Sequence, residues 1–408
     1  MYIKRKIEDD ILRYLDRKEI LAIVGPRQCG KTTTLLKIFN SLKQERKVFL
    51  NFEDREDLSL FENNIKRFAE VYAVENKYIF IDEFQYAKNG GKLLKYLYDL
   101  YNVKIIISGS SATDLTVKAI KFLVGRIFVL QMYPFDFYEF LLANDRNYAN
   151  VYLKSKVDFK NAKPASISQE EKNVLKNYYE NYIIWGGYPQ VVLTRELKDK
   201  REILKNIYNT YFLRDVKSIL GLIDDYKLNN LIKALALQIG NMIEYNELAR
   251  ISEFSLPTLK KYFNFLSKTY ICDFILPFYT NKRKEIVKNR KIFFYDTGLR
   301  NHIVNDFRAL DSRTDNGALL ENIFWMQIIK NGYSAQYWRD KNQNEVDFII
   351  DIGEGKLAAV EIKNRKNKCR RLPYPFIKAY YENTDMYCFY LLDDLKNDIK
   401  NRLFMPLF

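Results

Sequence analysis

The sequence predicts an α/β protein whose first domain is a parallel sheet around a phosphate-binding loop. Three observations support this prediction. An apolar, strand-like run at residues 19–24 leads directly into a glycine-rich loop. A second apolar run at residues 78–81 ends in two acidic residues. Strand-like runs then alternate with helix-like stretches, which implies a parallel sheet that binds ligands at the carboxyl ends of its strands.

The glycine-rich loop reads Gly25-Pro-Arg-Gln-Cys-Gly-Lys-Thr32 and fits the pattern G-x-x-x-x-G-K-[ST] at every fixed position. A strand before it and an apolar helix face after it are the context that this motif requires, and a chance glycine-rich turn would have neither. The glycines let successive N–H groups turn inward around phosphate oxygens, and the helix N-terminus adds a favourable dipole. Lys31 contributes a point charge, and Thr32 a hydroxyl ligand for Mg²⁺. We expect the nucleotide to contact Gly25, Pro26, Arg27, Gln28, Cys29, Gly30, Lys31, Thr32 and Thr33.

The second apolar run, residues 78–81, is followed by Asp82 and Glu83. An aspartate at the carboxyl end of a strand can hold Mg²⁺ through water, and the adjacent glutamate can polarise the attacking water. Residues 47–52 predict a strand between the loop and this run, and residues 103–108 and 126–130 predict a fourth and a fifth strand. The expected cofactors are therefore ATP and Mg²⁺.

Together these motifs resemble the additional-strand, catalytic-glutamate division of P-loop ATPases. Within it they are similar to archaeal and bacterial AAA-type ATPases that carry a C-terminal domain of formerly unknown function. The resemblance implies that Ser108 or Ser110 is a polar sensor of the γ-phosphate. It also places Arg126 where the family has a Gly-Arg pair, so that Arg126 either neutralises transition-state charge or is a surface arginine that opens a strand.

Beyond the predicted ATPase core at residues 1–143, residues 144–173 are polar and predict a surface loop. Helical spacing returns over residues 174–222, and the string Gly186-Gly-Tyr-Pro189 and residues 211–215 also resemble the family. Together they suggest a small helical lid over the nucleotide. Arg214 either reaches a phosphate from there or forms a surface ion pair.

Residues 223–292 predict a winged helix, because two short helices joined by a tight turn precede a β-hairpin. The tip of the hairpin, residues 281–290, is strongly basic. Two alternatives remain open, since a winged helix can clamp the phosphates of DNA or dock another protein. The residues expected to contact DNA are Thr258, Lys260, Lys261, Lys282, Arg283 and Lys284.

Residues 293–408 place an acid on a predicted helix, Glu321, before a predicted hairpin that carries Asp347, Glu361 and Lys363. Because side chains alternate along a strand, Glu361 and Lys363 share one face, and Asp347 can meet them from the paired strand. This is the pattern of the PD-(D/E)XK nuclease fold, in which the carboxylates hold Mg²⁺ or Mn²⁺ and the lysine orients or deprotonates water. Val346 stands where that pattern has proline. Such a domain is either an active nuclease or a binding module that does not cleave DNA.

Composition limits the chemistry further. The 66 Lys and Arg residues exceed the 51 Asp and Glu residues by 15, and DNA is the expected partner, although a protein partner and a homo-oligomer stay open. His302 is the only histidine, and the four cysteines form no C-x-x-C pair, so histidine-based active sites, zinc knuckles and a disulfide framework are not expected. No apolar run reaches the roughly 18 residues needed to cross a bilayer, and we expect a cytoplasmic protein.

The combined prediction is a Mg²⁺-dependent ATPase that binds DNA through parts that include a C-terminal nuclease-like domain, and cleavage of that DNA stays open. The alternative is an ATP-gated, protein-binding switch whose nuclease-like domain is inactive.

Overall fold

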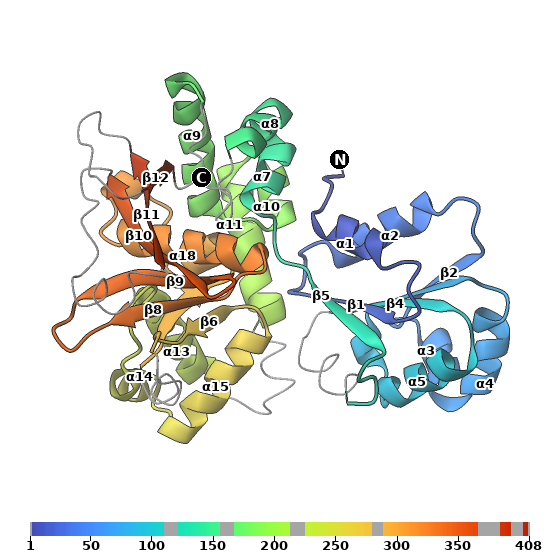
Figure 1. Ribbon diagram of the computed structural model, residues 1–408. Coiled ribbons are helices and arrows are strands. Elements are labelled where there is room, and N and C mark those ends of the chain that lie inside the picture. The colour runs from blue at the N-terminus through green and yellow to red at the C-terminus, as the bar shows by residue number, and fades with distance from the viewer. Residues whose placement is uncertain are drawn as a thin grey trace. The chain divides into compact units, whose positions relative to one another are not determined.

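A computed structural model shows that the chain folds into two compact units (Figure 1). Unit 1 comprises Met1–Phe135 with Lys268–Tyr270, and unit 2 comprises Asp136–Ser267 with Ile271–Phe408. This division differs from the five segments expected from the sequence, because the segments expected to form a lid and a winged helix pack with the C-terminal part of the chain. The structure describes residues 2–109, 121–155, 167–212, 225–279, 289–365, 384–392 and 403–406.

Unit 1 is built on a five-stranded parallel sheet with the strand order β2-β3-β4-β1-β5. Three of its strands are buried along their whole length, as expected for a parallel sheet covered on both faces. β4 lies between the strand that precedes the glycine-rich loop and the strand that ends in Asp82, so the expected additional strand is present. The sheet therefore confirms the predicted P-loop NTPase fold. Its strands are β1 (Ile20–Val24), β2 (Lys47–Asn51), β3 (Tyr78–Asp82), β4 (Lys104–Gly109) and β5 (Ile127–Gln131).

Helices cover both faces of this sheet (Figure 1). Because side chains alternate along a strand, Leu21 and Ile23 pack towards α1 and α2, whereas Ala22 and Val24 pack towards α3, α4 and α5. This double covering leaves the carboxyl edge of the strands as the place for a ligand. The helices are α1 (Ile7–Arg13), α2 (Lys31–Ser41), α3 (Arg55–Asn63), α4 (Ile65–Phe68), the π-helix η1 (Ala69–Ala73), the 3₁₀ helix η2 (Phe84–Tyr86) and α5 (Gly90–Leu100).

Unit 2 begins with helices. The expectation of a surface loop over residues 144–173 is wrong in part, because α8 and the start of α9 lie inside it. Local capping explains where α9 begins: the Ser168 hydroxyl accepts a hydrogen bond from the Glu171 N–H, and the Glu171 carboxylate accepts one from the Ser168 N–H. Among the described residues, no helix combines the length and apolarity needed to span a membrane. These first helices are α7 (Phe137–Asn144), α8 (Arg146–Ser155), α9 (Gln169–Trp185), α10 (Pro189–Leu193), α11 (Leu197–Asn206) and the π-helix η3 (Ile207–Phe212).

Three further helices and a two-stranded antiparallel hairpin follow: α13 (Asp225–Leu237), α14 (Tyr245–Ser252), α15 (Leu256–Lys268), β6 (Cys272–Ile275) and β7 (Lys291–Phe294). Between α13 and α14, Met242 forms an antiparallel bridge with Lys291 of β7. This element order matches the one expected for residues 223–292. The predicted basic tip lies mostly outside the described residues.

The C-terminal part of unit 2 is a mixed sheet with the strand order β12-β11-β10-β9-β8. The predicted hairpin is present as β9 and β10, which pair antiparallel, and β11 then pairs parallel to β10. Phe324 of α18 packs against Phe348 and Phe389, which fixes this helix on the sheet. Cys388 in β11 is disulfide-bonded, which the sequence analysis did not anticipate. The elements are α17 (Thr297–Val304), the 3₁₀ helix η4 (Leu310–Ser312), α18 (Asn316–Lys330), β8 (Ala335–Arg339), β9 (Glu345–Gly353), β10 (Lys356–Arg365), β11 (Thr384–Leu392) and β12 (Leu403–Pro406).

The string Gly186-Gly-Tyr-Pro189, which resembles the ATPase family, meets the start of α17 inside unit 2. The N–H of Gly187 donates a hydrogen bond of 2.7 Å to Oδ2 of Asp296. The other carboxylate oxygen, Oδ1, accepts from the Leu299 N–H and so caps α17. A Cβ atom on Gly186 would lie 2.2 Å from Oδ1 of Asp296, and one on Gly298 would lie 2.0 Å from the Trp185 carbonyl oxygen. The glycines are therefore needed for close approach, and the segment expected to form a lid is anchored to α17.

Candidate functional site

The glycine-rich loop connects β1 to α2, as the motif requires. A Cβ atom on Gly25 would lie 2.0 Å from the carbonyl oxygen of Met132, so only glycine fits there. Gln28 and Gly30 both have left-handed backbones, with φ of 59° and 101°. These turns give the loop the curvature of an anion-binding nest at a helix N-terminus.

The Lys31 side chain bends back over this loop. Its Nζ atom donates hydrogen bonds to the carbonyl oxygens of Gly25 at 3.0 Å and Pro26 at 2.8 Å. Lys31 is buried, whereas Thr32 and Thr33 are exposed at the start of α2. The lysine ammonium thus lies within the loop, where a phosphate oxygen can replace one of the carbonyl oxygens.

Asp82, at the carboxyl end of β3, joins the second predicted motif to the loop. Its Oδ2 accepts a hydrogen bond of 2.6 Å from the Thr32 hydroxyl, and its Oδ1 accepts from the Ser108 hydroxyl and the Glu83 N–H. Only 1% of Asp82 is exposed, so these donors hold the carboxylate in one orientation. A hydroxyl and a carboxylate oxygen side by side are hard ligands of the kind that Mg²⁺ prefers.

Glu83 is half-buried next to Asp82 and has a left-handed backbone with φ of 53°. A non-glycine residue with this φ is uncommon, and such positions cluster at functional sites. The Glu83 carboxylate accepts a hydrogen bond from the Gln85 amide, which orients it. Ser110, the alternative sensor to Ser108, lies outside the described residues, as does Arg214.

Sequence reasoning missed Arg5. This arginine is 4% exposed, and it donates hydrogen bonds of 2.6 Å to the carbonyl oxygens of Cys29 and Tyr133. Its guanidinium also lies 4.7 Å from the centre of the Phe135 ring. In a trans peptide the C=O and the N–H point in opposite directions, so fixing the Cys29 C=O also fixes the Gly30 N–H. No local sequence signal marks Arg5, because its partners lie 24 and 128 positions away.

The expectation that Arg126 neutralises charge at the phosphates is corrected by the geometry within this chain. Arg126 precedes β5, and its carbonyl oxygen accepts from the N–H of Ile20, the first residue of β1. It therefore lies at the amino edge of the sheet, whereas the loop follows the carboxyl end of β1. β5 has 5 residues, and at about 3.3 Å per residue the two edges are roughly 16 Å apart. Arg126 forms an ion pair with Asp99, at 3.0 Å, as the surface alternative expects.

The second predicted cluster assembles in unit 2. Lys363 of β10 lies 2.9 Å from the Glu361 carboxylate and 3.3 Å from Oδ2 of Asp347 on β9, so the predicted shared face is confirmed. Oδ2 of Asp347 also accepts the N–H of Ile362 at 2.7 Å. Burial alone would lower the pKa of Lys363, but the two carboxylates outweigh burial and raise it.

Lys291 of β7 enters the same cluster, and the sequence analysis missed it. Its Nζ lies 3.4 Å from Oε2 of Glu321 and also contacts the Glu345 carboxylate. Burial alone would lower the pKa of Lys291, but Glu321, Glu345 and Asp347 raise it above its ordinary value. Burial raises the pKa of Glu321 to about 7.

The predicted metal site at Glu321, Asp347 and Glu361 stays a prediction. Among the described residues, no three acidic, histidine or cysteine side chains form a group that could hold a metal ion. The carboxylates are instead paired with Lys291 and Lys363, whose ammonium groups supply the positive charge that a divalent cation would bring.

Of the residues expected to contact DNA, the structure describes the three on α15. Lys260 and Lys261 are exposed, and the Thr258 hydroxyl lies 2.9 Å from the Ser255 hydroxyl. Lys282, Arg283 and Lys284 lie outside the described residues.

Comparison with known families agrees with unit 1. Residues 17–141 match the family described as AAA domain. The parallel sheet, the glycine-rich loop and this match together support the class of AAA-type P-loop ATPases for unit 1, with ATP binding and hydrolysis as its activity. Residues 176–310 and 316–405 match two families that are each described as a domain of unknown function.

Two relatives match this chain over most of their length. An uncharacterized protein of Haemophilus influenzae is 27% identical over 83% of this chain and 81% of the relative, and one of Methanocaldococcus jannaschii is 27% identical over 92% and 80%. Among solved structures, a Walker-type ATPase of Pyrococcus abyssi is 14% identical and covers 74% of this chain and 96% of its own, with a TM-score of 0.48. AMPPCP-bound DnaA from Aquifex aeolicus is 15% identical over 65% of this chain and 89% of its own, with a TM-score of 0.31.

Proposed function

We propose that this chain is a Mg²⁺-dependent ATPase whose unit 2 engages DNA. The observation that carries the ATPase part is the hydrogen bond between Thr32 and Asp82, which brings the glycine-rich loop and the carboxyl end of β3 together. Mg²⁺ bound here would neutralise charge on the β- and γ-phosphates. Thr32 and Asp82 would hold it, and Ser108 would keep the Asp82 carboxylate in position.

Glu83 then acts as the group that orients and polarises the attacking water. It follows Asp82 directly, its carboxylate is held by Gln85, and its backbone adopts the left-handed conformation. Lys31 and the loop N–H groups stabilise the charge on the phosphates as the bond breaks. Each role uses a side chain at the carboxyl edge of the sheet.

The DNA part of the proposal rests on α13, α14, α15 and the β6–β7 hairpin. Their order supports a winged helix, with α15 as the helix that enters the groove. Lys260 and Lys261 are exposed on that helix, and the chain has a formal net charge of +15. Lysines that contact DNA phosphates increase the affinity for DNA, and this contribution falls steeply as the salt concentration rises.

A second candidate function is an ATP-gated switch that docks a protein partner. One observation favours it: the acids of the carboxylate cluster are paired with Lys291 and Lys363, and a metal ion would have to displace these ion pairs before the C-terminal domain could cleave DNA. In this case ATP controls how unit 2 binds a protein partner, and unit 2 does not bind nucleic acid.

One experiment separates the two functions. ATP hydrolysis by the full-length protein is measured in Mg²⁺ with and without duplex DNA, next to the Lys31→Ala variant as a control for contaminating ATPases. We expect hydrolysis that depends on Lys31 and is stimulated by DNA, with salt-dependent DNA binding measured in parallel. Hydrolysis with no stimulation and no DNA binding would favour the protein-docking switch. The absence of any hydrolysis that depends on Lys31 would contradict both functions.

A further inference from the structure

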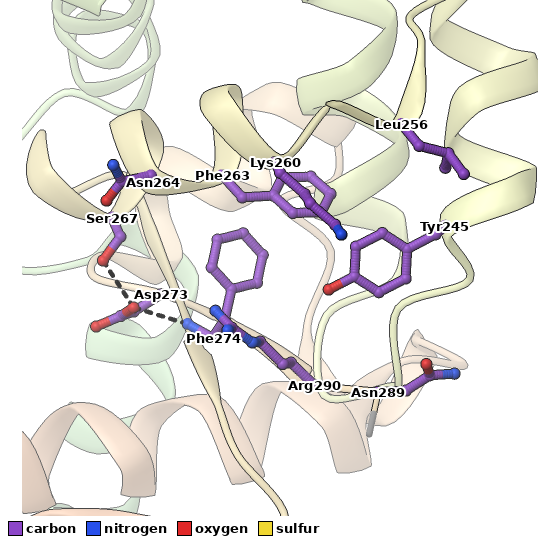
Figure 2. Close-up of a pocket in the computed structure, with 10 residues that line it drawn as sticks. All are labelled: Tyr245, Leu256, Lys260, Phe263, Asn264, Ser267, Asp273, Phe274, Asn289 and Arg290. Carbon is purple, nitrogen blue, oxygen red and sulfur yellow. Dashed lines mark hydrogen bonds between the residues drawn. The ribbon is translucent and has the colours of Figure 1, made fainter. Parts of the chain in front are cut away.

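A cavity of about 720 Å³ opens between α15 and the base of the β6–β7 hairpin (Figure 2). Its walls come from α14, α15, β6 and the two residues that precede β7. Within the part of the chain that the structure describes, it is therefore formed by elements of the proposed winged helix alone. None of the functions described so far uses it.

Aromatic rings form one wall of the cavity. The ring of Phe274 lies 4.8 Å from that of Phe263, which in turn lies 5.7 Å from that of Tyr245. Phe263 is buried and supports the other two, whereas Phe274 and Tyr245 are only half-buried and face the cavity (Figure 2). A supported ring with an open face is a stacking platform for a nucleobase, because every base has a π-face.

Cations lie beside these rings. Lys260 on α15 and Arg290 before β7 both line the cavity, from opposite sides of the aromatic wall (Figure 2). The one acid in the lining, Asp273, is already bound by three donors: the Ser267 hydroxyl, the Phe274 N–H and the Tyr295 hydroxyl, each at 2.8 Å. Because its oxygens are engaged in these bonds, Asp273 helps to build the wall, and the two cations are available for an anion.

We propose that this cavity binds one unpaired nucleotide of a DNA strand, with the base against Phe274 and the phosphate between Lys260 and Arg290. The proposal rests on the DNA-binding function proposed above and names the form of DNA that unit 2 prefers. A base inside a duplex is stacked on both sides and cannot enter a concave aromatic site, whereas a base in a single-stranded extension can. The preferred substrate is therefore a duplex with a single-stranded extension, gap or fork.

Binding to a blunt duplex is compared with binding to the same duplex carrying a short single-stranded extension, using full-length protein and fluorescence anisotropy at one salt concentration. We expect the extension to tighten binding by about tenfold, within the range measured for stacking of one base. Phe274→Leu keeps an apolar side chain and should remove this preference while leaving affinity for the blunt duplex unchanged. A 2-aminopurine base in the extension should be quenched by the wild-type protein and not by Phe274→Leu.

Phe254→Leu is the matched control, because Phe254 stacks on Tyr262 at 4.6 Å in the same region and does not line the cavity. It should retain the preference and the quenching. Equal affinity for the two DNAs, or a preference that Phe274→Leu leaves intact, would overturn the inference while the proposed function stands. Failure of the wild-type protein to bind either DNA would overturn the DNA part of the proposed function as well.

Discussion

The Nζ atom of Lys291 lies 3.4 Å from Oε2 of Glu321, and only 4% of the lysine side chain is exposed. Lys291 belongs to the hairpin strand β7 and Glu321 to helix α18, so this ion pair joins two elements that lie 30 residues apart in the sequence. Lys291 also neutralises Glu345, which begins β9. The lysine thus joins Glu321, which the sequence analysis assigns to a metal, to Glu345, which it does not.

Replacing Lys291 with methionine should destabilise unit 2, because it leaves the Glu321 and Glu345 carboxylates without their shared counter-charge. We expect a loss of roughly 3 kcal/mol, the order found when one partner of a buried ion pair is removed. It would be measured as a lower midpoint of thermal unfolding of the full-length protein. Lys77→Met is the control, since Lys77 pairs with Glu45 on the surface and should change the midpoint little. An unchanged midpoint in Lys291→Met would refute this role.

The lysine pairing also predicts how the protein responds to manganese. In the absence of nucleotide, electron paramagnetic resonance titration with Mn²⁺ should give the same binding curve for the wild-type protein and for Asp347→Asn. The reason is that both carboxylates already form ion pairs with Lys363. One tightly bound Mn²⁺ that disappears in Asp347→Asn would restore the metal-site interpretation.

Arg5 should matter for nucleotide affinity because it holds the Cys29 and Tyr133 carbonyl oxygens beside the glycine-rich loop. Arg5→Lys retains the charge but cannot reach Cys29 and Tyr133 together, so the Gly30 N–H loses its fixed orientation. We expect a dissociation constant for ATP about tenfold higher, consistent with the loss of one or two charge-assisted hydrogen bonds. Fluorescent-nucleotide titration would measure it, with Lys4→Ala as the control, because Lys4 is exposed and pairs with Asp9. Equal affinity in Arg5→Lys and the wild type would show that the contact is only structural.

Arg126→Ala tests the position of Arg126 at the opposite edge of the sheet. An exposed ion pair such as that of Arg126 with Asp99 contributes about 0–1 kcal/mol to stability. The turnover number for ATP should stay within about twofold of the wild-type value, since neutralisation of transition-state charge by an arginine is worth roughly a thousandfold or more. A loss of that size in steady-state hydrolysis would show that Arg126 reaches phosphate, which within this geometry requires another copy of the chain.

Contacts between residues close to a motif were predictable, and contacts between distant residues were not. The glycine-rich loop and Asp82 follow from local patterns whose chemistry is tied to a fixed spacing. The additional strand between β1 and β3 follows from the family resemblance. Arg5 and Lys291 carry no such pattern, because each acts through partners that only the tertiary fold brings near. The placement of Arg126 was within reach of sequence reasoning, since a residue that precedes a parallel strand lies at the edge opposite to a loop that follows one.

The central claim is that residues at the carboxyl edge of the unit 1 sheet bind and hydrolyse ATP, with Glu83 activating water. Steady-state ATP hydrolysis by Glu83→Gln, with nucleotide binding measured on the same preparation, tests it most directly. The amide keeps the size of the side chain and its contact with Gln85, but it cannot accept a proton. We predict that Glu83→Gln binds ATP as tightly as the wild-type protein and loses turnover by about a hundredfold or more. Full turnover in Glu83→Gln would contradict the account.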